Sequence, residues 1–201
     1  MSSNGLDAAR INKIFAHPMG IFFTADHHFG HTNIISYHNR PFSNANEMNE
    51  VLIQNWNDVV KQTDTVYHLG DVSVLRPERT KEILDRLHGK IFLIRGNHDY
   101  AAESKECASR FEWVKDYHFL VLNGGVQIAL MHYAMRVWNN RGHGAWNFYG
   151  HSHGKLPPVD GTFALDVGVD CWEYRPVSLH TIRDKMIERG WEARTPRPSK
   201  T

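Results

Sequence analysis

Three short apolar runs alternate with segments of helical spacing in the first half of the chain. The runs are Gly20–Ala25, Thr65–Leu69 and Ile91–Ile94, and their aromatic and β-branched residues favour buried strands. Between them, Asn44–Lys61 and Pro77–His88 place apolar residues three and four apart after a helix-starting residue, which predicts two amphipathic helices. The order strand, helix, strand, helix, strand indicates an α/β fold.

The second half has a different pattern. Tyr117–Leu122 and Val126–Met131 flank Asn123-Gly124-Gly125, which is a hairpin signal. We expect a more antiparallel half here, and therefore two packed sheets with helices outside. The remaining predicted elements are short strands near Asn147–Tyr149, Thr162–Val167 and Val177–Leu179, and a closing helix over Thr181–Arg189.

Length and composition indicate one globular domain. The chain has 201 residues, of which 41% are hydrophobic and 22% charged, and this length suits a single core. We place the domain at residues 1–190 and expect the polar, basic and proline-containing residues 191–201 to form a disordered tail. The net charge of +1 lacks the basic field of a dedicated nucleic-acid binder.

Cysteine usage and the N-terminal sequence bear on the compartment. Cys107 and Cys171 have neither zinc nor redox-motif spacing, and two free thiols in a reducing compartment are expected. The first residues lack a basic start followed by an apolar run, and no apolar stretch approaches the ~20 residues that span a bilayer. We therefore expect a cytoplasmic protein without a membrane partner.

Polar motifs follow the predicted strands at the point where each one ends. In open α/β sheets, the space beyond the strand ends is where ligands bind. Carboxylate, amide and imidazole donors suit Mn, Fe, Zn or Ni, and no cysteine accompanies them as it would in a thiolate zinc site. The motifs are Asp26-His27-His28, Gly70-Asp71, Gly96-Asn97-His98-Asp99, Met131-His132 and Gly150-His151-Ser152-His153.

Spacing within two of these motifs predicts shared metals. Asp26 and His28 are separated by one residue, so in extended chain both side chains point the same way and one metal can take both. His151 and His153 have the same spacing, and they either share a metal or divide between two.

The order of these five motifs, from Asp26 to His153, resembles the calcineurin-like metallophosphoesterases. The resemblance implies a four-layer α/β/β/α sandwich of two mixed sheets, with a dinuclear metal site at the strand ends. It implies two divalent ions, with manganese favoured and iron, zinc, nickel or magnesium as alternatives. The implied ligands are Asp26, His28 and His153 for one metal, Asn97, His132 and His151 for the other, and Asp71 as the bridge.

The resemblance also implies a mechanism. Two cations roughly 3.5–4 Å apart hold a bridging water and lower its pKa toward ~7, so that a metal-bridging hydroxide attacks phosphorus. His98 resembles the family's catalytic histidine, which contacts the phosphoryl group or protonates the leaving oxygen, and Asp99 is placed to hold its ring. Gly70-Asp71 lacks the Asp-Arg-Gly continuation of the protein phosphatases, so a phosphoprotein substrate is not expected. Tyr133 stands after His132, where many relatives have glycine.

A second resemblance lies outside the metal motifs. His28–Ile35 and Asn39–Phe42 resemble a small group of bacterial and phage-type phosphoesterases of about this length. This implies that His31 and Arg40 lie near the metals, where Arg40 would bind a phosphate oxygen; the alternatives are a solvated loop histidine and a turn arginine.

The segment Tyr133–Phe148 joins two ligand-bearing strands. It offers Arg136 as a phosphate contact and tryptophans as stacking faces for a base. The alternative is a loop whose tryptophans cover the core.

Three functions remain open from these residues. The favoured one is hydrolysis of a phosphodiester or phosphomonoester in a small substrate, for which a nucleotide is one candidate. A nuclease would use the same metals but should weaken steeply with salt, and the charge of +1 speaks mildly against it. An inactive metal-binding scaffold for protein partners would typically have lost ligands, whereas here all are present.

Overall fold

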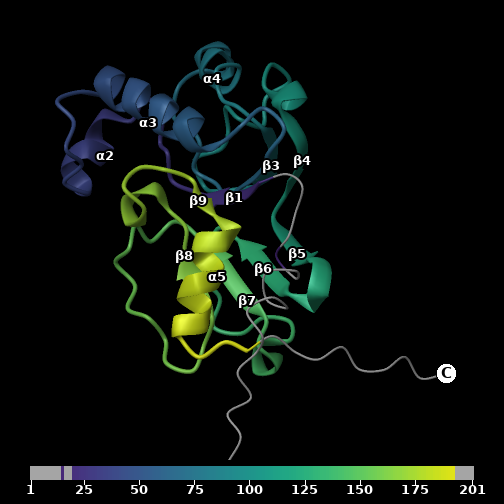
Figure 1. The fold of residues 1–201 in the computed structure, drawn as a ribbon. Helices are drawn as coiled ribbons and strands as arrows, with labels where there is room; N and C mark the ends of the chain where they lie inside the picture. The colour runs from purple at the N-terminus through teal and green to yellow at the C-terminus, as the bar shows by residue number, and fades with distance from the viewer. Residues whose placement is uncertain (1–14, 16–19, 193–201) are drawn as a thin grey trace, which may run out of the picture.

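The computed structural model describes Phe15 and residues 20–192, and two β-sheets form its frame (Figure 1). The first sheet has the order β4-β3-β2-β1-β9. Strands β1 to β4 run parallel, and β9 pairs antiparallel with β1. The strands are β1 (Ile21–Thr24), β2 (Thr65–His68), β3 (Lys90–Ile94), β4 (Phe111–Lys115) and β9 (Val177–Ser178). Of these, β4 was not predicted from the sequence.

The second sheet has the order β5-β6-β7-β8. The predicted hairpin joins β5 to β6 antiparallel, with Asn123–Gly125 as its turn. The expectation of a more antiparallel half is wrong beyond that hairpin, since β6–β7 and β7–β8 are parallel. The connections are long enough to return the chain to the same end of the sheet, as parallel pairing requires. The strands are β5 (Tyr117–Val121), β6 (Gln127–Met131), β7 (Trp146–Tyr149) and β8 (Ala164–Asp166).

Four helices with described bounds accompany the sheets. The expected first helix forms, and its N-cap Asn44 accepts from the backbone amide of Glu47 at 3.0 Å. The Glu47 carboxylate accepts from the amide of Ser43 rather than that of Asn44, so the capping box is shifted by one residue. The short helix α2 was not predicted. The helices are α2 (Thr32–Tyr37), α3 (Ala45–Val59), α4 (Pro77–Leu84) and α5 (Leu179–Glu188).

Apolar residues on the two faces of β1 belong to two different core clusters. Phe22 packs with Trp56 of α3 and Leu84 of α4, so these helices cover the outer face of the first sheet. Phe23 belongs to the cluster that holds Phe148 of β7 and residues of α5, so this face meets the second sheet. The two mixed sheets and their helices confirm the α/β class, while the fourth layer of the expected sandwich stays a prediction.

The C-terminal boundary of the domain lies beyond the predicted one. Trp191 is buried and stacks edge-on against Trp146, and its indole N–H donates to the carbonyl of Gly144. It therefore belongs to the core rather than to a tail. The rest of the expected tail, residues 193–201, and the N-terminal residues 1–14 and 16–19 lie outside the described part of the chain.

The cysteines and the helices bear on two further expectations. Cys107 and Cys171 are both free thiols, as predicted. Within residues 20–192, no helix has the length and apolar character needed to cross a membrane.

Candidate metal centre

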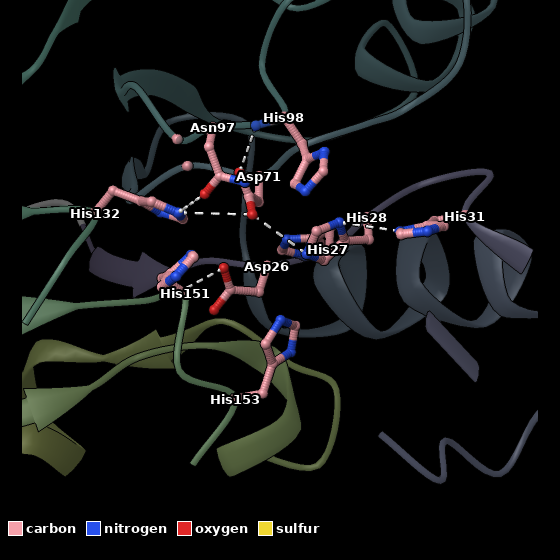
Figure 2. Close-up of polar contacts among 12 residues, drawn as sticks. Asp26, His27, His28, His31, Asp71, Asn97, His98, His132, His151 and His153 are labelled. Carbon is pink, nitrogen blue, oxygen red and sulfur yellow. Dashed lines mark hydrogen bonds and ion pairs between the residues drawn. The ribbon is translucent and has the colours of Figure 1, made fainter. Parts of the chain in front are cut away.

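The seven predicted ligands lie together where the strands end (Figure 2). Six of them form two groups of side chains, within each of which the ligand atoms lie within 4.8 Å of one another. Parallel pairing of β1 with β2, and of β6 with β7, brings the carboxyl ends of these strands to one edge. One group is Asp26, His28 and His153, and the other is Asp71, His132 and His151.

Asp71 belongs to the second group and also contacts the first. Its Oδ2 is 3.4 Å from Nε2 of His28 and 3.6 Å from Nε2 of His132. Asn97 joins the second group, since its Oδ1 lies 3.2 Å from the same nitrogen of His132. One carboxylate oxygen is thus shared by both groups, which is the position that a bridging ligand needs.

Two buried polar atoms in the first group have no hydrogen-bond partner. These are Oδ2 of Asp26 and Nε2 of His28. Leaving a buried polar atom unpaired costs about 1–3 kcal/mol, and a divalent cation would satisfy both. The residues therefore fit a metal, and their carboxylate, imidazole and amide chemistry fits Mn, Fe, Zn or Ni.

The backbone of five ligands has positive φ. The angles are 60° at Asp26, 51° at His28, 59° at Asp71, 64° at His151 and 47° at His153. Residues other than glycine rarely adopt this left-handed region, and such strain gathers at functional sites.

Glycines allow the carboxylates to approach the backbone. A Cβ on Gly96 would come within 2.3 Å of Oδ1 of Asp71, and one on Gly168 within 2.6 Å of Oδ2 of Asp26. These positions hold glycine because a side chain would displace the ligand beside it.

Burial favours the neutral forms of Asp26 and His28. It raises the pKa of Asp26 well above its ordinary value, and nearby Asp166 and Asp71 add to the rise. Burial also lowers the pKa of His28 to about 2, with further lowering by His153. At neutral pH the His28 imidazole is therefore uncharged, which is the form that binds a metal.

His98 lies at the rim of this centre. Its backbone is tied to Asp71 and its side chain is exposed. Its ring centroid is 5.3 Å from that of His28 and 6.1 Å from that of His31. The imidazole can therefore reach a group bound at the ligands.

Asp99 has a different place from the expected one. Its carboxylate accepts from the amides of Asp71, Val72 and Gly96 at 2.7–3.0 Å. The structure does not support the expectation that Asp99 holds the His98 ring, because both of its oxygens are engaged with these backbone amides. Asp99 instead fixes the Gly70-Asp71 turn against the loop that carries His98.

Arg40 also differs from expectation. It is 4% exposed, and its donors contact Asp170 and the carbonyls of Asp26 and His27. The predicted phosphate contact is not supported, because the guanidinium lies behind the ligands with its donors already used.

His31 lies near the ligands, as expected, whereas Arg136 does not. His31 lines the hollow over the ligands and lies 3.5 Å from His28, between their Nδ1 atoms. Arg136 is exposed and does not line that hollow, so the expected phosphate contact is not supported.

Most of the segment Tyr133–Phe148 does not contact the ligands, so it does not form the expected wall of a substrate site. Trp146 is fully buried in the core, and Trp138 donates to the carbonyl of Ala145. Only Tyr133 of this segment reaches the ligands, with its hydroxyl 3.3 Å from Oδ1 of Asn97. The alternative, in which the tryptophans cover the core, holds for Trp146.

Two residues at the centre were missed in the sequence. Asp170 accepts from Nδ1 of His153 at 2.7 Å, and His38 stacks on the His153 ring with centroids 3.7 Å apart. Neither belongs to a strand-end motif, and only the folded chain brings them to His153.

A larger hollow of about 670 Å³ lies near the starts of α3 and α4. It contains none of the ligands, and its charged side chains pair with one another, as Arg86 with Glu50 and Arg79 with Glu82. The hollow that matters chemically is therefore the one of about 630 Å³ over the ligands.

The fold and the two ligand groups define an α/β protein with a candidate metal centre at its strand ends. The sequence model of the calcineurin-like phosphoesterase superfamily domain matches residues 19–169. The chain belongs to this superfamily, as the motifs from Asp26 to His153 indicated.

Two similar proteins carry no assigned activity. The uncharacterized protein MJ1445 of Methanocaldococcus jannaschii is 38% identical over 182 residues, which are 87% of this chain and 95% of that protein. The crystal structure of AQ665, a protein of unknown function from Aquifex aeolicus, has a TM-score of 0.64 and 23% identity. It covers 83% of this chain and 99% of its own, and it supports the fold alone.

Proposed function

We propose that this protein hydrolyses a phosphate ester of a small molecule, using two divalent metal ions held by the two ligand groups. The observation that carries the proposal is Asp71, whose Oδ2 lies 3.4 Å from His28 and 3.6 Å from His132. When bound, the ions would supply Lewis acidity and lower the pKa of a coordinated water molecule. We favour manganese, given the mixed carboxylate, amide and imidazole donors.

The side chains around the ligands support the remaining steps. In this proposal the exposed imidazole of His98 donates a proton to the leaving oxygen. Asp99 holds the loop that carries it, through the amides of Asp71, Val72 and Gly96. Tyr133 orients the Asn97 carbonyl through the contact between its hydroxyl and Oδ1.

The hollow over the ligands suits a small substrate with an aromatic part. Its volume is about 630 Å³, which is in the range of small-molecule sites. Tyr37 lines it with 63% of its surface exposed, and Leu156 with 47%. Lys155 adds a cation on the same rim. A nucleotide, with a base to stack and a phosphate to pair, matches this lining, and the net charge of +1 disfavours a polymer.

Hydrolysis of a chromogenic phosphodiester and of the matching monoester tests the proposal. Metal-stripped protein is refilled with Mn²⁺, and wild type is compared with Asp71→Asn. We expect turnover that needs Mn²⁺ and is lost in the folded variant, and the diester-to-monoester ratio defines the substrate class. If wild type binds two Mn²⁺ and hydrolyses neither these esters nor a panel of nucleotides, the proposal is wrong and a scaffold role takes its place.

A further inference from the structure

Arg40 connects segments that lie far apart in the sequence. Its Nε and Nη2 donate to the two oxygens of Asp170 at 2.8 and 2.7 Å, across a separation of 130 residues. Nη2 also donates to the carbonyl of Asp26 at 2.7 Å, and Nη1 to that of His27 at 3.0 Å. Arg40 makes these four contacts through one planar guanidinium, whereas a lysine ammonium has only three N–H donors.

Asp170, which Arg40 holds, in turn contacts the predicted metal ligand His153. Its Oδ2 accepts from Nδ1 of His153 at 2.7 Å. The proton on Nδ1 leaves the lone pair of Nε2 free to bind a metal, and the contact fixes the ring orientation.

The second ligand group is oriented in another way. Nδ1 of His132 lies 2.7 Å from the carbonyl of Leu69, which is the neutral backbone acceptor beside β2. His153 therefore depends on a carboxylate side chain from a distant turn, whereas His132, which follows β6, depends on a backbone carbonyl that follows β2 of the other sheet. The two groups should respond differently when Asp170 is changed.

We propose that Arg40 and Asp170 act as positioning residues for the metal site formed by Asp26, His28 and His153. Arg40 holds the carbonyls around Asp26, where the backbone has positive φ at Asp26 and His28. Asp170 holds the ring of His153 at the same centre. The inference rests on the proposed metal-dependent function, and it assigns to Arg40 a role in holding the metal ligands from behind instead of a role in binding the substrate.

Metal binding in single-site variants tests this proposal. His132→Ala leaves the first ligand group intact, and His153→Ala leaves the second. Asp170→Ala and Asp170→Asn are added to each background, and the Kd for Mn²⁺ is measured by calorimetry. Asp170→Asn keeps the volume and an acceptor oxygen, so it decides the question if Asp170→Ala does not fold.

We expect the Asp170 substitutions to weaken Mn²⁺ binding at the first ligand group only. In the His132→Ala background, Asp170→Ala raises the Kd for Mn²⁺ by about 10–100-fold, and Asp170→Asn raises it by less. In the His153→Ala background, neither variant changes the Kd. Asp64→Ala is the matched control, because Asp64 is also a buried carboxylate that accepts from backbone amides, those of Gly20 and Lys61, and it should leave both Kd values unchanged.

Two outcomes overturn the inference in distinguishable ways. If wild type binds two Mn²⁺ and hydrolyses esters while folded Asp170 variants bind normally, or bind more weakly in both backgrounds, only this inference fails. If wild type binds no divalent metal, the proposed function fails and this inference fails with it.

Discussion

The backbone N–H of His98 donates to Oδ1 of Asp71 at 2.8 Å. The loop that carries the exposed imidazole is thereby fixed to the carboxylate between the two ligand groups. Only the backbone of His98 makes this contact, so the side chain can be removed without breaking it. The role of the ring can therefore be tested apart from the position of the loop.

Removing the His98 ring should reduce turnover while leaving metal binding intact. For His98→Ala we expect kcat to fall by about 10²–10⁴-fold, which is the usual contribution of a positioned proton donor. The Mn²⁺ content should stay at the wild-type value because no ligand changes. His143→Ala is the control, since His143 is an exposed histidine outside the hollow. Full turnover in His98→Ala would remove His98 from the mechanism.

The Asp99→Asn variant tests whether Asp99 fixes the loop that carries His98 or orients the His98 ring. An amide cannot accept from all three backbone N–H groups that Asp99 satisfies, so we expect a loss of about 1–3 kcal/mol in unfolding free energy. Weaker Mn²⁺ binding should accompany it, because the Asp71 turn loosens. The shape of the pH–rate profile should not change. A shift in an apparent pKa of that profile, with the unfolding free energy unchanged, would instead support a contact between Asp99 and the His98 ring.

Gly96→Ala should disable the centre by steric conflict. The new Cβ would lie 2.3 Å from Oδ1 of Asp71 and 2.5 Å from its backbone nitrogen. We expect about 1–3 kcal/mol of destabilisation from overpacking, together with loss of Mn²⁺ binding. Gly142→Ala is the matched control, because a Cβ there meets nothing within 4 Å. Thermal melts and metal titrations of both variants check this, and equal behaviour of the two would contradict it.

A buried histidine pair should make the metal-free protein sensitive to acid. Burial, with a contribution from His132, lowers the pKa of His68 from 6.5 to about 3, and His68 bonds the buried His27. The unfolded chain takes up this proton near pH 6.5, whereas the folded chain does not until about pH 3. The stability contributed by neutral His68 is therefore present above the unfolded pKa and is lost as the pH falls through this window.

The measurement is urea unfolding of metal-free protein at about pH 6.5 and at about pH 5. Between these two pH values the unfolded chain binds up to one more proton at residue 68 than the folded chain does. His68 should therefore account for about 2 kcal/mol of the loss in unfolding free energy. In His68→Gln, which does not titrate, the decline should be smaller by that amount. Parallel declines in the two proteins would show that His68 is not buried in its neutral form.

The sequence was most informative where chemistry and local structure coincide. Asp26, Asp71 and Asn97 each follow a short apolar run, so the order of strands and polar residues was enough to place these ligands at one sheet edge. Arg40 and Asp99 were placed near the centre correctly but given the wrong contacts. A sequence shows that a charged residue is close to a motif, and not which atoms its side chain faces.

The features that were missed depend on long-range packing. Asp170 meets Arg40 across 130 residues, and no local period or motif encodes that meeting. The parallel pairing of β7 and β8 was missed for the same reason, since a hairpin signal is local and a crossover is not. Trp191 was assigned to a tail because its neighbours are polar, yet its burial comes from contact with Trp146.

The left-handed backbone at five ligands implies a trade-off between activity and robustness. Glycine adopts that conformation with less strain than aspartate or histidine, so replacing a ligand by glycine would relax the local backbone while destroying the centre. Aspartate and histidine stand at all five positions, so the side chains that can bind a metal are present at the expense of local backbone strain.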